Sequence, residues 1–469
     1  MPTDVQKLLS VTESAELEAR LEADLQKNRV GLDEKDDSQP HGTPAEHNSH
    51  NSLISQERTW PKLDSEALHG IVGEIVRTIA PYTEADPVTL VAHTISEFSA
   101  IIGRSAYTEI DGNQPPLVFW PVLVGTTSKS RKGSGENRIK RLFQEACPDW
   151  SRGQYRGTLS SGEGLVHAVR DPQLKINKNG KEELVDEGVE DKRLYLVQSE
   201  FGVMLKIMRR EGNSLSGVIR DAWDGLDLRP MTKNNRITAT NPHIVIAGHV
   251  TQEELVRQLS EADMANGFAN RFAWFMVRRA NIIPNATNPP FDEMASLARK
   301  LREAIEFATN AEKVTLNNEA LEIWNDIYRS LSEGKPGMVG ALLARSEPYV
   351  RRLAALYALM DETTVVSGHH MIAALALWQY AEDSVAWIFG DKLGDPIMDT
   401  ILDGLKTAPD GLSDTQISDL FGRHESASRL SAAKGRLQAQ SKIYSCETET
   451  KGRLKTKWYA TAKKAKNAN

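Results

Sequence analysis

Four runs of consecutive apolar residues stand in the middle of the chain, separated by segments with polar or helical spacing. Continuous apolar runs are typical of strands buried on both faces, whereas a strand with one wet face alternates apolar and polar residues. Strands that alternate with helices indicate a parallel sheet covered on both faces by helices, which is the α/β class. The runs that predict this sheet are LVFWPVLVG, RLYLVQSE, NPHIVIAGHV and FAWFMVRR.

Helical periodicity dominates on either side of these runs. Two helices are expected ahead of the first run, in SEALHGIVGEIVRTIAPY and PVTLVAHTISEFSAIIG. From residue 288 onward, apolar residues recur at every third or fourth position and no strand pattern interrupts them. We therefore expect residues 59–287 to form the α/β core and residues 288–392 to form an all-helical lid.

Residues 393–469 change pattern again. Two helices are expected in PIMDTILDGLKTA and LSDTQISDLF, with Ser413 placed to cap the second. A third helix follows in ESASRLSAAKGRLQAQSKI, and YSCETETKGRLKTKWYATA has the pattern of a hairpin. Leu430, Leu437 and Ile443 are expected to pack inward. Three helices with a basic hairpin predict a winged helix, a variant of the helix-turn-helix.

Residues 1–58 differ from the rest in composition. Leucines at helical spacing predict an amphipathic helix, and the polar segment after it, rich in Pro, Gly, His and Asn, is typical of a disordered linker. This stretch holds 12 acidic and 6 basic side chains, whereas residues 421–469 hold 12 basic and 3 acidic ones. A basic end favours an anionic partner, although a solvated lysine-rich surface gives the same count.

Bulk composition excludes several classes of protein. The chain of 469 residues has no apolar run long enough to cross a membrane, and its acidic start lacks the parts of a signal peptide. Cys147 and Cys446 are too few for a disulfide framework or a zinc cluster. We expect a cytoplasmic protein without a membrane partner.

The first apolar run leads into the loop GTTSKSRKGS, residues 125–134, here called the Gly125 loop. A strand, a small polar turn with lysine and a helix start are the parts of a phosphate-binding loop, whose usual pattern is G-x-x-x-x-G-K-[ST]. Lys132 follows Gly125 one position later than usual, while Lys129 follows too soon to enclose two phosphates. We expect Lys132 to contact phosphate and Ser134 to bind Mg²⁺. A basic turn without a ligand is the competing interpretation. The other residues expected to line the loop are Thr126, Thr127, Ser128 and Gly133.

Polar residues at the ends of the next two runs complete a candidate hydrolytic site. Glu200 is placed to polarise an attacking water, while Gln198 occupies a position where a metal-binding carboxylate is expected. His249 is one of the last two residues of the third run and Thr251 directly follows the run, where a polar group can reach a γ-phosphate. The alternatives are an ordinary charged strand end for Glu200 and a structural hydrogen bond for His249.

Arg271 precedes the fourth run. An arginine that reaches the γ-phosphate of a neighbouring subunit accelerates phosphoryl transfer by about 10³–10⁵. Arg271 suits this role if the protein forms a ring. A structural salt bridge is the alternative.

As an ordered set, these segments resemble the P-loop ATPase family of phages, plasmids and integrated elements. That family is known mainly as a domain of unknown function and is often found with primase-polymerase domains. The resemblance spans about residues 60–390 and implies bound ATP and Mg²⁺. Members commonly carry Arg-Lys in the loop, which matches Arg131 and Lys132. The motifs that carry it are VGTTSKSRKGS, LSSGEGLVHAVRDP, EFGVMLKIMRREGNSLSGVIRDAWDG, HIVIAGHVTQEEL, GFANRFAWFMVRR and EPYVRRLAALYALMD.

The order of motifs is also similar to helicases of the minichromosome-maintenance and related AAA+ type. That similarity implies a trans-acting arginine at Arg271 and a second nucleotide-contacting arginine at Arg351 or Arg352. It further implies a homo-oligomeric ring, such as a hexamer, and a separate primase or other replication protein as a partner. The longer loop and Gln198 depart from the pattern of these helicases.

The C-terminal module carries the basic residues expected to contact DNA, single- or double-stranded. Polar and basic side chains on a helix can reach base edges or phosphates, and a basic hairpin suits the phosphate backbone. Protein binding is the alternative for such a module. The candidates are Arg429, Lys434 and Arg436 on the third helix, and Lys451, Arg453, Lys455 and Lys457 on the hairpin.

The sequence therefore favours a DNA-dependent ATPase, acting as a replicative helicase or origin-remodelling motor of a mobile genetic element. A DNA-binding replication initiator or regulator with a structural or inactive nucleotide site is the alternative. A third interpretation is a nucleotide-switched scaffold whose acidic N-terminal helix recruits a replication protein.

Overall fold

The computed structural model describes the chain from residue 59 to residue 461 with short gaps, so the helix and linker predicted for residues 1–58 lie outside the described part. Residues 59–335 and 339–388 pack into one compact unit, and a second unit begins at Phe389. The boundary predicted at residue 288 falls inside the first unit. The described ranges are 59–153, 155–157, 159–178, 180–229, 237–335, 337–390, 395–450 and 453–461.

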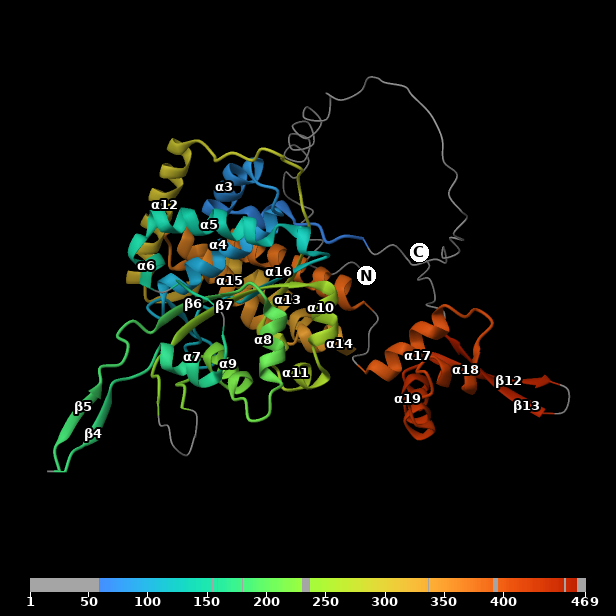
Figure 1. Ribbon diagram of the computed structural model, residues 1–469. Coiled ribbons are helices and arrows are strands. Elements are labelled where there is room, and N and C mark those ends of the chain that lie inside the picture. The colour runs from blue at the N-terminus through green and yellow to red at the C-terminus, as the bar shows by residue number, and fades with distance from the viewer. Residues whose placement is uncertain are drawn as a thin grey trace, which may run out of the picture. The chain divides into compact units, whose positions relative to one another are not determined.

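A five-stranded parallel sheet forms the centre of the first unit (Figure 1). All four predicted runs supply strands, and the strand order is β3-β6-β7-β2-β8. The register places Gly125 at the end of β2 beside Thr251 of β7 and Val277 of β8. The predicted α/β sheet is therefore confirmed, and β3 adds a two-residue edge strand. The bounds are β2 Pro121–Gly125, β3 Tyr155–Arg156, β6 Arg193–Gln198, β7 His243–Thr251 and β8 Ala273–Val277.

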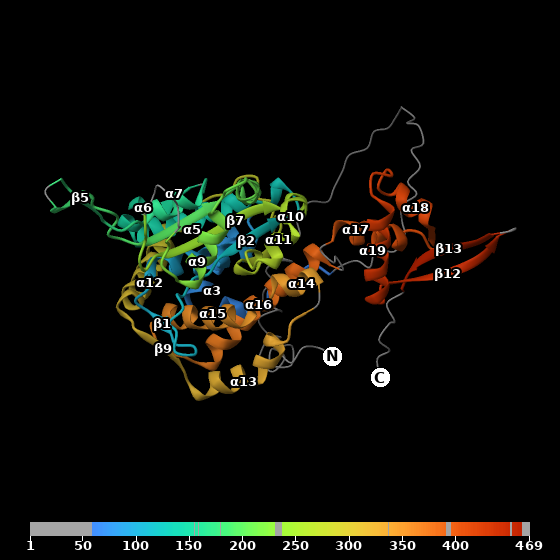
Figure 2. The same cartoon turned by 90° about the horizontal axis from the view of Figure 1, so that it is seen from below.

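Helices cover both faces of this sheet (Figures 1 and 2). On one face lies α4, which Asp86 caps ahead of a proline and which is buried along its whole length after that proline. Alternate residues of β7 separate the two faces: His249 contacts His93 of α4, whereas a side chain at Gly248 would collide with Phe201 of α8. The bounds are α4 Pro87–Ile102 on the first face, and α8 Phe201–Met208, α9 Leu215–Asp224 and α10 Gln252–Gln258 on the other.

The Gly125 loop lies where the chain changes direction through the sheet. β2 comes first in sequence among the five strands; the next three lie on one side of it, and β8 lies on its other side. Ligands of open parallel sheets bind outside the carboxyl ends of the strands at such a switch point. The topology therefore places this loop at the position where a ligand is expected.

The region predicted as an all-helical lid also contains strands, so that prediction is wrong. The expected helices are present, but β9 pairs in parallel with β1, which precedes the main sheet, and with β10. These strands span only two to four residues, too few for an apolar period to show. The bounds are β1 Tyr107–Thr108, β9 Lys313–Leu316, β10 Val365–Val366, α12 Phe291–Asn310, α13 Asn318–Ser332, α14 Gly337–Leu342, α15 Ser346–Met360 and α16 Gly368–Phe389.

A two-stranded hairpin of β4 and β5 extends away from the rest of this unit (Figure 1). Its apolar side chains Leu174, Ile176, Leu184 and Val185 are exposed. In the described part of the chain, no helix has the length and apolar character needed to span a membrane. The remaining elements of the unit are η1 Ser65–Leu68, α3 Gly70–Ile79, η2 Ala80–Tyr82, η3 Ser128–Ser130, α5 Lys132–Ala146, α6 Pro148–Gly153, α7 Gly162–Ala168, β4 Gln173–Ile176, β5 Glu182–Asp186, α11 Glu261–Ala265 and η4 Ala269–Arg271.

The second unit combines three helices with an antiparallel sheet of order β11-β13-β12. Leu430, Leu437 and Ile443 are buried in its core, as predicted. Ser413 caps α18 and exchanges bonds with Gln416, which confirms the predicted cap. The bounds are α17 Pro396–Lys406, β11 Leu412–Ser413, α18 Asp414–Asp419, α19 Ala427–Ala439, β12 Ile443–Thr450 and β13 Arg453–Ala460.

Candidate functional site: the Gly125 loop and its surroundings

The Gly125 loop enters α5 through a residue in the left-handed conformation. Thr127 and Ser130 close the turn η3 by bonding to each other's backbone. Arg131 follows with φ 59°, and α5 begins at Lys132. This conformation is uncommon for a residue other than glycine and costs about 1–2 kcal/mol. A backbone outlier of this kind raises a hypothesis of function.

The Lys132 side chain folds back over the start of the loop. A Cβ built on Gly125 would lie 2.5 Å from Lys132 Nζ and 2.4 Å from Ser130 Oγ, so only glycine leaves room for the ammonium group. Within the described ranges, the Lys132 ammonium makes no hydrogen bond and no ion pair. Burial lowers the pKa of Lys132, because desolvation disfavours the charged form. The loop thus holds an unpaired, half-buried cation at the carboxyl end of β2.

Backbone donors at the start of α5 add to this cation. Arg131 is the N-cap residue, and its side chain makes no capping bond. The amides of Ser134 and Gly135 donate to the Arg131 carbonyl at 3.1 and 3.2 Å, whereas those of Lys132 and Gly133 find no acceptor among the described residues. Open amides and the dipole of a helix start both attract anions.

The Arg131 side chain turns to a carboxylate instead of the loop interior. Its Nε lies 2.7 Å from Glu84 Oε2, and Glu84 also pairs with Arg279 and accepts the Ile283 amide at 2.9 Å. In this arrangement Arg131 anchors the loop to the segment before α4. The expected phosphate contact of Arg131 requires this pair to open. The remaining loop side chains Thr126, Thr127, Ser128 and Ser134 are exposed.

Glu200 lies at the same edge of the sheet as Lys132. β6 ends two residues before Glu200, and its last residue Gln198 lies beside Gly248 of β7, which in turn lies beside Val122 of β2. Two strand spacings, about 10 Å, therefore separate β6 from β2. Glu200 is exposed, and its carboxylate makes no hydrogen bond or ion pair within the described part of the chain.

The Gln198 side chain is hydrogen-bonded to the backbone that follows the outer strand β3. Its side-chain oxygen accepts the Leu159 amide at 3.0 Å, and its side-chain nitrogen donates to the Gly157 carbonyl at 3.2 Å. The side chain is buried and holds the segment after β3 against β6. Its amide is therefore occupied by the backbone and not directed to a metal.

His249, expected near a γ-phosphate, is buried in a hydrogen-bonded group behind the loop, so its predicted contact would require the ring to leave this group. His249 Nε2 and His93 Nε2 lie 2.9 Å apart, so one ring donates to the other, and His93 Nδ1 lies 3.2 Å from the Tyr195 hydroxyl. Burial lowers the pKa of both histidines, for His93 to about 3. Glu136 Oε2 lies 3.8 Å from His249 Nδ1. Thr251 accepts the Glu254 amide and caps α10.

Glu97 of α4 lies in the same buried region and predicts a pH dependence of stability. Burial, together with the nearby Glu136 carboxylate, raises its pKa from 4.5 to about 8. Between these values the unfolded chain has lost a proton that the folded protein keeps, so folding stability falls as the pH rises through this window.

We expect Glu97→Gln, which is neutral at every pH, to gain stability relative to the natural chain between pH 5 and pH 8, on the order of a few kcal/mol. Urea unfolding at several pH values measures the difference in unfolding free energy. Exposed Glu303→Gln is the control and should show no such trend. An equally flat difference for Glu97→Gln would contradict the assignment.

The arginines outside the loop that are expected to contact nucleotide, namely Arg271, Arg351 and Arg352, lie away from the Gly125 loop of the same chain. Arg271 precedes β8, whose first residue pairs with the start of β2, so it lies at the opposite edge of the sheet. Its Nη2 donates to Asp224 at 2.5 Å, which is the salt bridge left open as the alternative. Arg352 is buried against Trp223, and Arg351 stacks on Trp324 of α13. A trans role for Arg271 would require it to leave Asp224.

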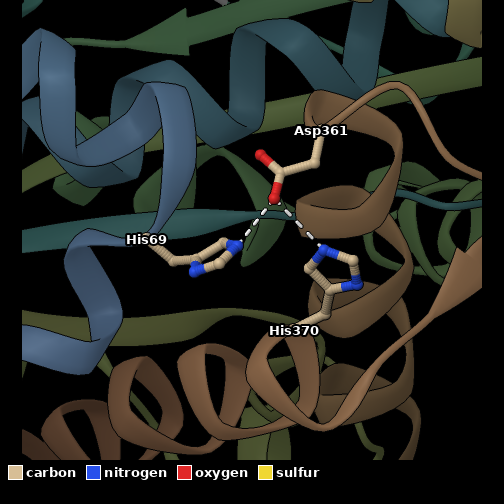
Figure 3. A group of neighbouring side chains, drawn as sticks. All are labelled: His69, Asp361 and His370. Atoms are coloured by element: carbon tan, nitrogen blue, oxygen red, sulfur yellow. Dashed lines mark hydrogen bonds and ion pairs between the residues drawn. The ribbon is translucent and has the colours of Figure 1, made fainter.

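His69, Asp361 and His370 form a second cluster of titratable groups, where α3, α15 and α16 meet (Figure 3). Both rings approach Asp361 Oδ2, at 2.6 Å from His69 and 3.2 Å from His370, and only glycine at position 70 leaves space for the carboxylate. His370 Nδ1 accepts the Ser367 amide at 3.0 Å, so its Nε2 carries the proton. A metal-bound histidine ring donates a hydrogen bond from its other nitrogen. In His370 that other nitrogen accepts one, so the cluster fits hydrogen bonding and not a metal.

A cavity of about 490 Å³ lies beside α7 and β6, two strands away from β2. Two of its polar groups are already paired: Ser161 caps α7 by accepting the Gly164 amide, and Arg170 holds Asp186 through two bonds. The Arg170 guanidinium is therefore neutralised by a carboxylate, unlike the Lys132 ammonium.

The basic side chains described in the second unit are largely paired within it. Lys434 binds Asp414 and covers Trp458, while Arg429 pairs with Glu425 at 2.7 Å. The remaining candidates are Arg436, which is 3.4 Å from Asp395, and Lys457, which donates to the Asp410 carbonyl; Lys451 and the side chains of Arg453 and Lys455 lie outside the described part.

No protein-family model matches this chain, and no curated protein is significantly similar to it. The geometry of the loop, the sheet and the second unit is therefore the basis for a function.

Proposed function

We propose that the first unit is a P-loop ATPase and that ATP binds at the Gly125 loop. The observation that carries the proposal is the unpaired Lys132 ammonium over Gly125, beside the open amides of α5. This cradle lies at the switch point of a parallel sheet, where phosphates of nucleotides are commonly bound. A cation and helix-start amides within one loop fit a triphosphate better than a neutral ligand.

The residues present also fit a magnesium ion. The Ser134 hydroxyl is exposed two residues after Lys132 and would hold the ion, which when bound neutralises charge on the phosphates. Lys132 would hold the terminal phosphates in place. Glu200, exposed and without an ion pair at the same edge, would orient water and take its proton.

We extend the proposal to a DNA-dependent motor, a replicative helicase or origin-remodelling ATPase of a mobile genetic element. Three helices and an antiparallel hairpin in the second unit support a winged helix that binds DNA. From residue 395 to the end the chain has 13 basic and 9 acidic residues, a smaller excess than the last 49 residues alone suggest. Affinity for DNA should therefore be moderate and salt-dependent. A homo-oligomeric ring and a primase partner belong to the same proposal.

The motor predicts that single-stranded DNA stimulates ATP turnover of the full chain by about tenfold or more, as an order of magnitude for a coupled cycle. Phosphate release measured with and without DNA, at low and high salt, tests this. Stimulation that weakens with salt supports the motor.

Tight DNA binding without any turnover would favour the alternative, a replication initiator or regulator with an inactive nucleotide site. One observation favours that alternative. A second metal-binding carboxylate would be needed at position 198, but Gln198 stands there and its side-chain amide is bonded to the backbone of Leu159 and Gly157.

A further inference from the structure

Three arginines converge on the indole of Trp223 at the edge of the sheet opposite the Gly125 loop. The guanidinium carbons of Arg352, Arg345 and Arg271 lie 3.7, 4.6 and 5.7 Å from the ring centroid. They come from α15, the turn before α15 and the turn before β8, and Trp223 stands near the end of α9. We call these four residues with Asp224 the arginine node.

The positive charge of the node is only partly compensated. Asp224 contacts Arg271 at 2.5 Å and Arg345 at 3.4 Å, and no other carboxylate in the described ranges forms an ion pair with the three arginines. The three guanidinium groups therefore share one ion-pairing carboxylate, and the Asp221 carboxylate adds a longer-range interaction with Arg271. The Trp223 ring offsets a part of the positive charge through cation–π contacts with the three guanidinium groups.

Donors in the node also lack acceptors. Arg271 and Arg352 are more than nine-tenths buried. Nε of Arg271 and both Nε and Nη1 of Arg352 are buried without a partner in the described part of the chain. Burial lowers the pKa of Arg352 to about 9, which leaves it charged at neutral pH. A buried charge without a partner is destabilising, because nothing replaces the hydration it has lost.

We propose that the arginine node is a binding site for a phosphate group, distinct from the Gly125 loop. Asp224 and Arg345 are both about 30% exposed and form its open side. A phosphate dianion would take the place of Asp224 between Arg271 and Arg345 and accept hydrogen bonds from these two guanidinium groups. Arginine suits this ligand because its planar fork matches phosphate oxygens. The phosphate can come from free phosphate, from a nucleotide or from a nucleic-acid backbone.

The test uses the full chain carrying Lys132→Ala, so that the Gly125 loop does not contribute. Calorimetric titrations with inorganic phosphate, with ATP and with a short single-stranded oligonucleotide distinguish the three sources. Asp224→Asn removes the competing carboxylate and should tighten binding about fivefold or more. Arg345→Gln removes one guanidinium and should weaken it about tenfold. Asp227→Asn, in the exposed pair with Arg229, is the matched control and should change nothing.

Opposite signs for two substitutions in one node separate a binding site from a purely structural cluster, because misfolding would weaken binding in both. The probe that binds most tightly identifies the source of the phosphate. For any of the three probes, tighter binding by Asp224→Asn together with weaker binding by Arg345→Gln supports the site. No binding of any probe, or weaker binding by Asp224→Asn, would overturn the proposal. Failure of the Gly125 loop to bind ATP would not affect it, because Lys132 is already removed.

Discussion

Replacing Lys132 with alanine is expected to lower the affinity for ATP at least about 100-fold and to abolish turnover. Charge-assisted bonds to phosphate are each worth about 1.5–3 kcal/mol, and the ammonium group is expected to make more than one. The side chain forms no ion pair in the described part of the chain, so its removal should leave folding stability nearly unchanged. Titration with ATP measures the affinity, and thermal unfolding checks the fold.

Lys129→Ala is the matched control for this prediction. Lys129 lies in the same loop and is exposed, so alanine there should reduce ATP affinity only slightly through the loss of a distant charge. Equal losses in both variants would indicate a general electrostatic effect of a basic loop. A loss confined to Lys129→Ala would contradict the assignment of the phosphate lysine.

Glu200→Gln is expected to reduce ATP turnover about 10²–10⁴-fold, the usual contribution of a general base, while ATP affinity stays within about threefold of that of the natural chain. The amide keeps the size of the side chain but cannot accept the proton from water. Phosphate release in a single turnover measures the chemical step, and titration measures binding.

Glu253→Gln provides the control, because Glu253 is an exposed carboxylate on α10, which follows β7 at the same edge of the sheet. Full turnover in Glu200→Gln would show that a group other than Glu200 accepts the proton from water. Glu136, on the first turns of α5 and 3.8 Å from His249, would then be the next residue to replace.

The sheet could be predicted from the sequence because its strands are long and apolar throughout. Leu194 to Val197 and Ile244 to Ala247 are buried on both faces, and a buried parallel strand needs no alternation. The four-residue strand β9 and the two-residue strand β3 are too short to be predicted in this way. Their pairing is decided by helices and strands distant in sequence, and that tertiary influence leaves no local period.

The candidate site could be predicted only in part. The strand, loop and helix start around Lys132 are local in sequence, so spacing alone places them together. The partners of Arg131 and His249 are not local: Glu84 and His93 approach from the region before and within α4. For Arg271, the sequence shows only an arginine just before an apolar strand, and this position fits a trans-acting residue and a structural salt bridge equally well. Only the fold brings Asp224 to it.

A crystal structure of the full chain with a non-hydrolysable ATP analogue and Mg²⁺ would show whether ATP binds at the Gly125 loop. We expect the β- and γ-phosphates between Lys132 Nζ and the first amides of α5, with the metal at Ser134 and the carboxylate of Glu200 facing the γ-phosphate. A nucleotide bound elsewhere, or an empty Gly125 loop with Lys132 still folded over Gly125 at saturating analogue, would contradict this expectation.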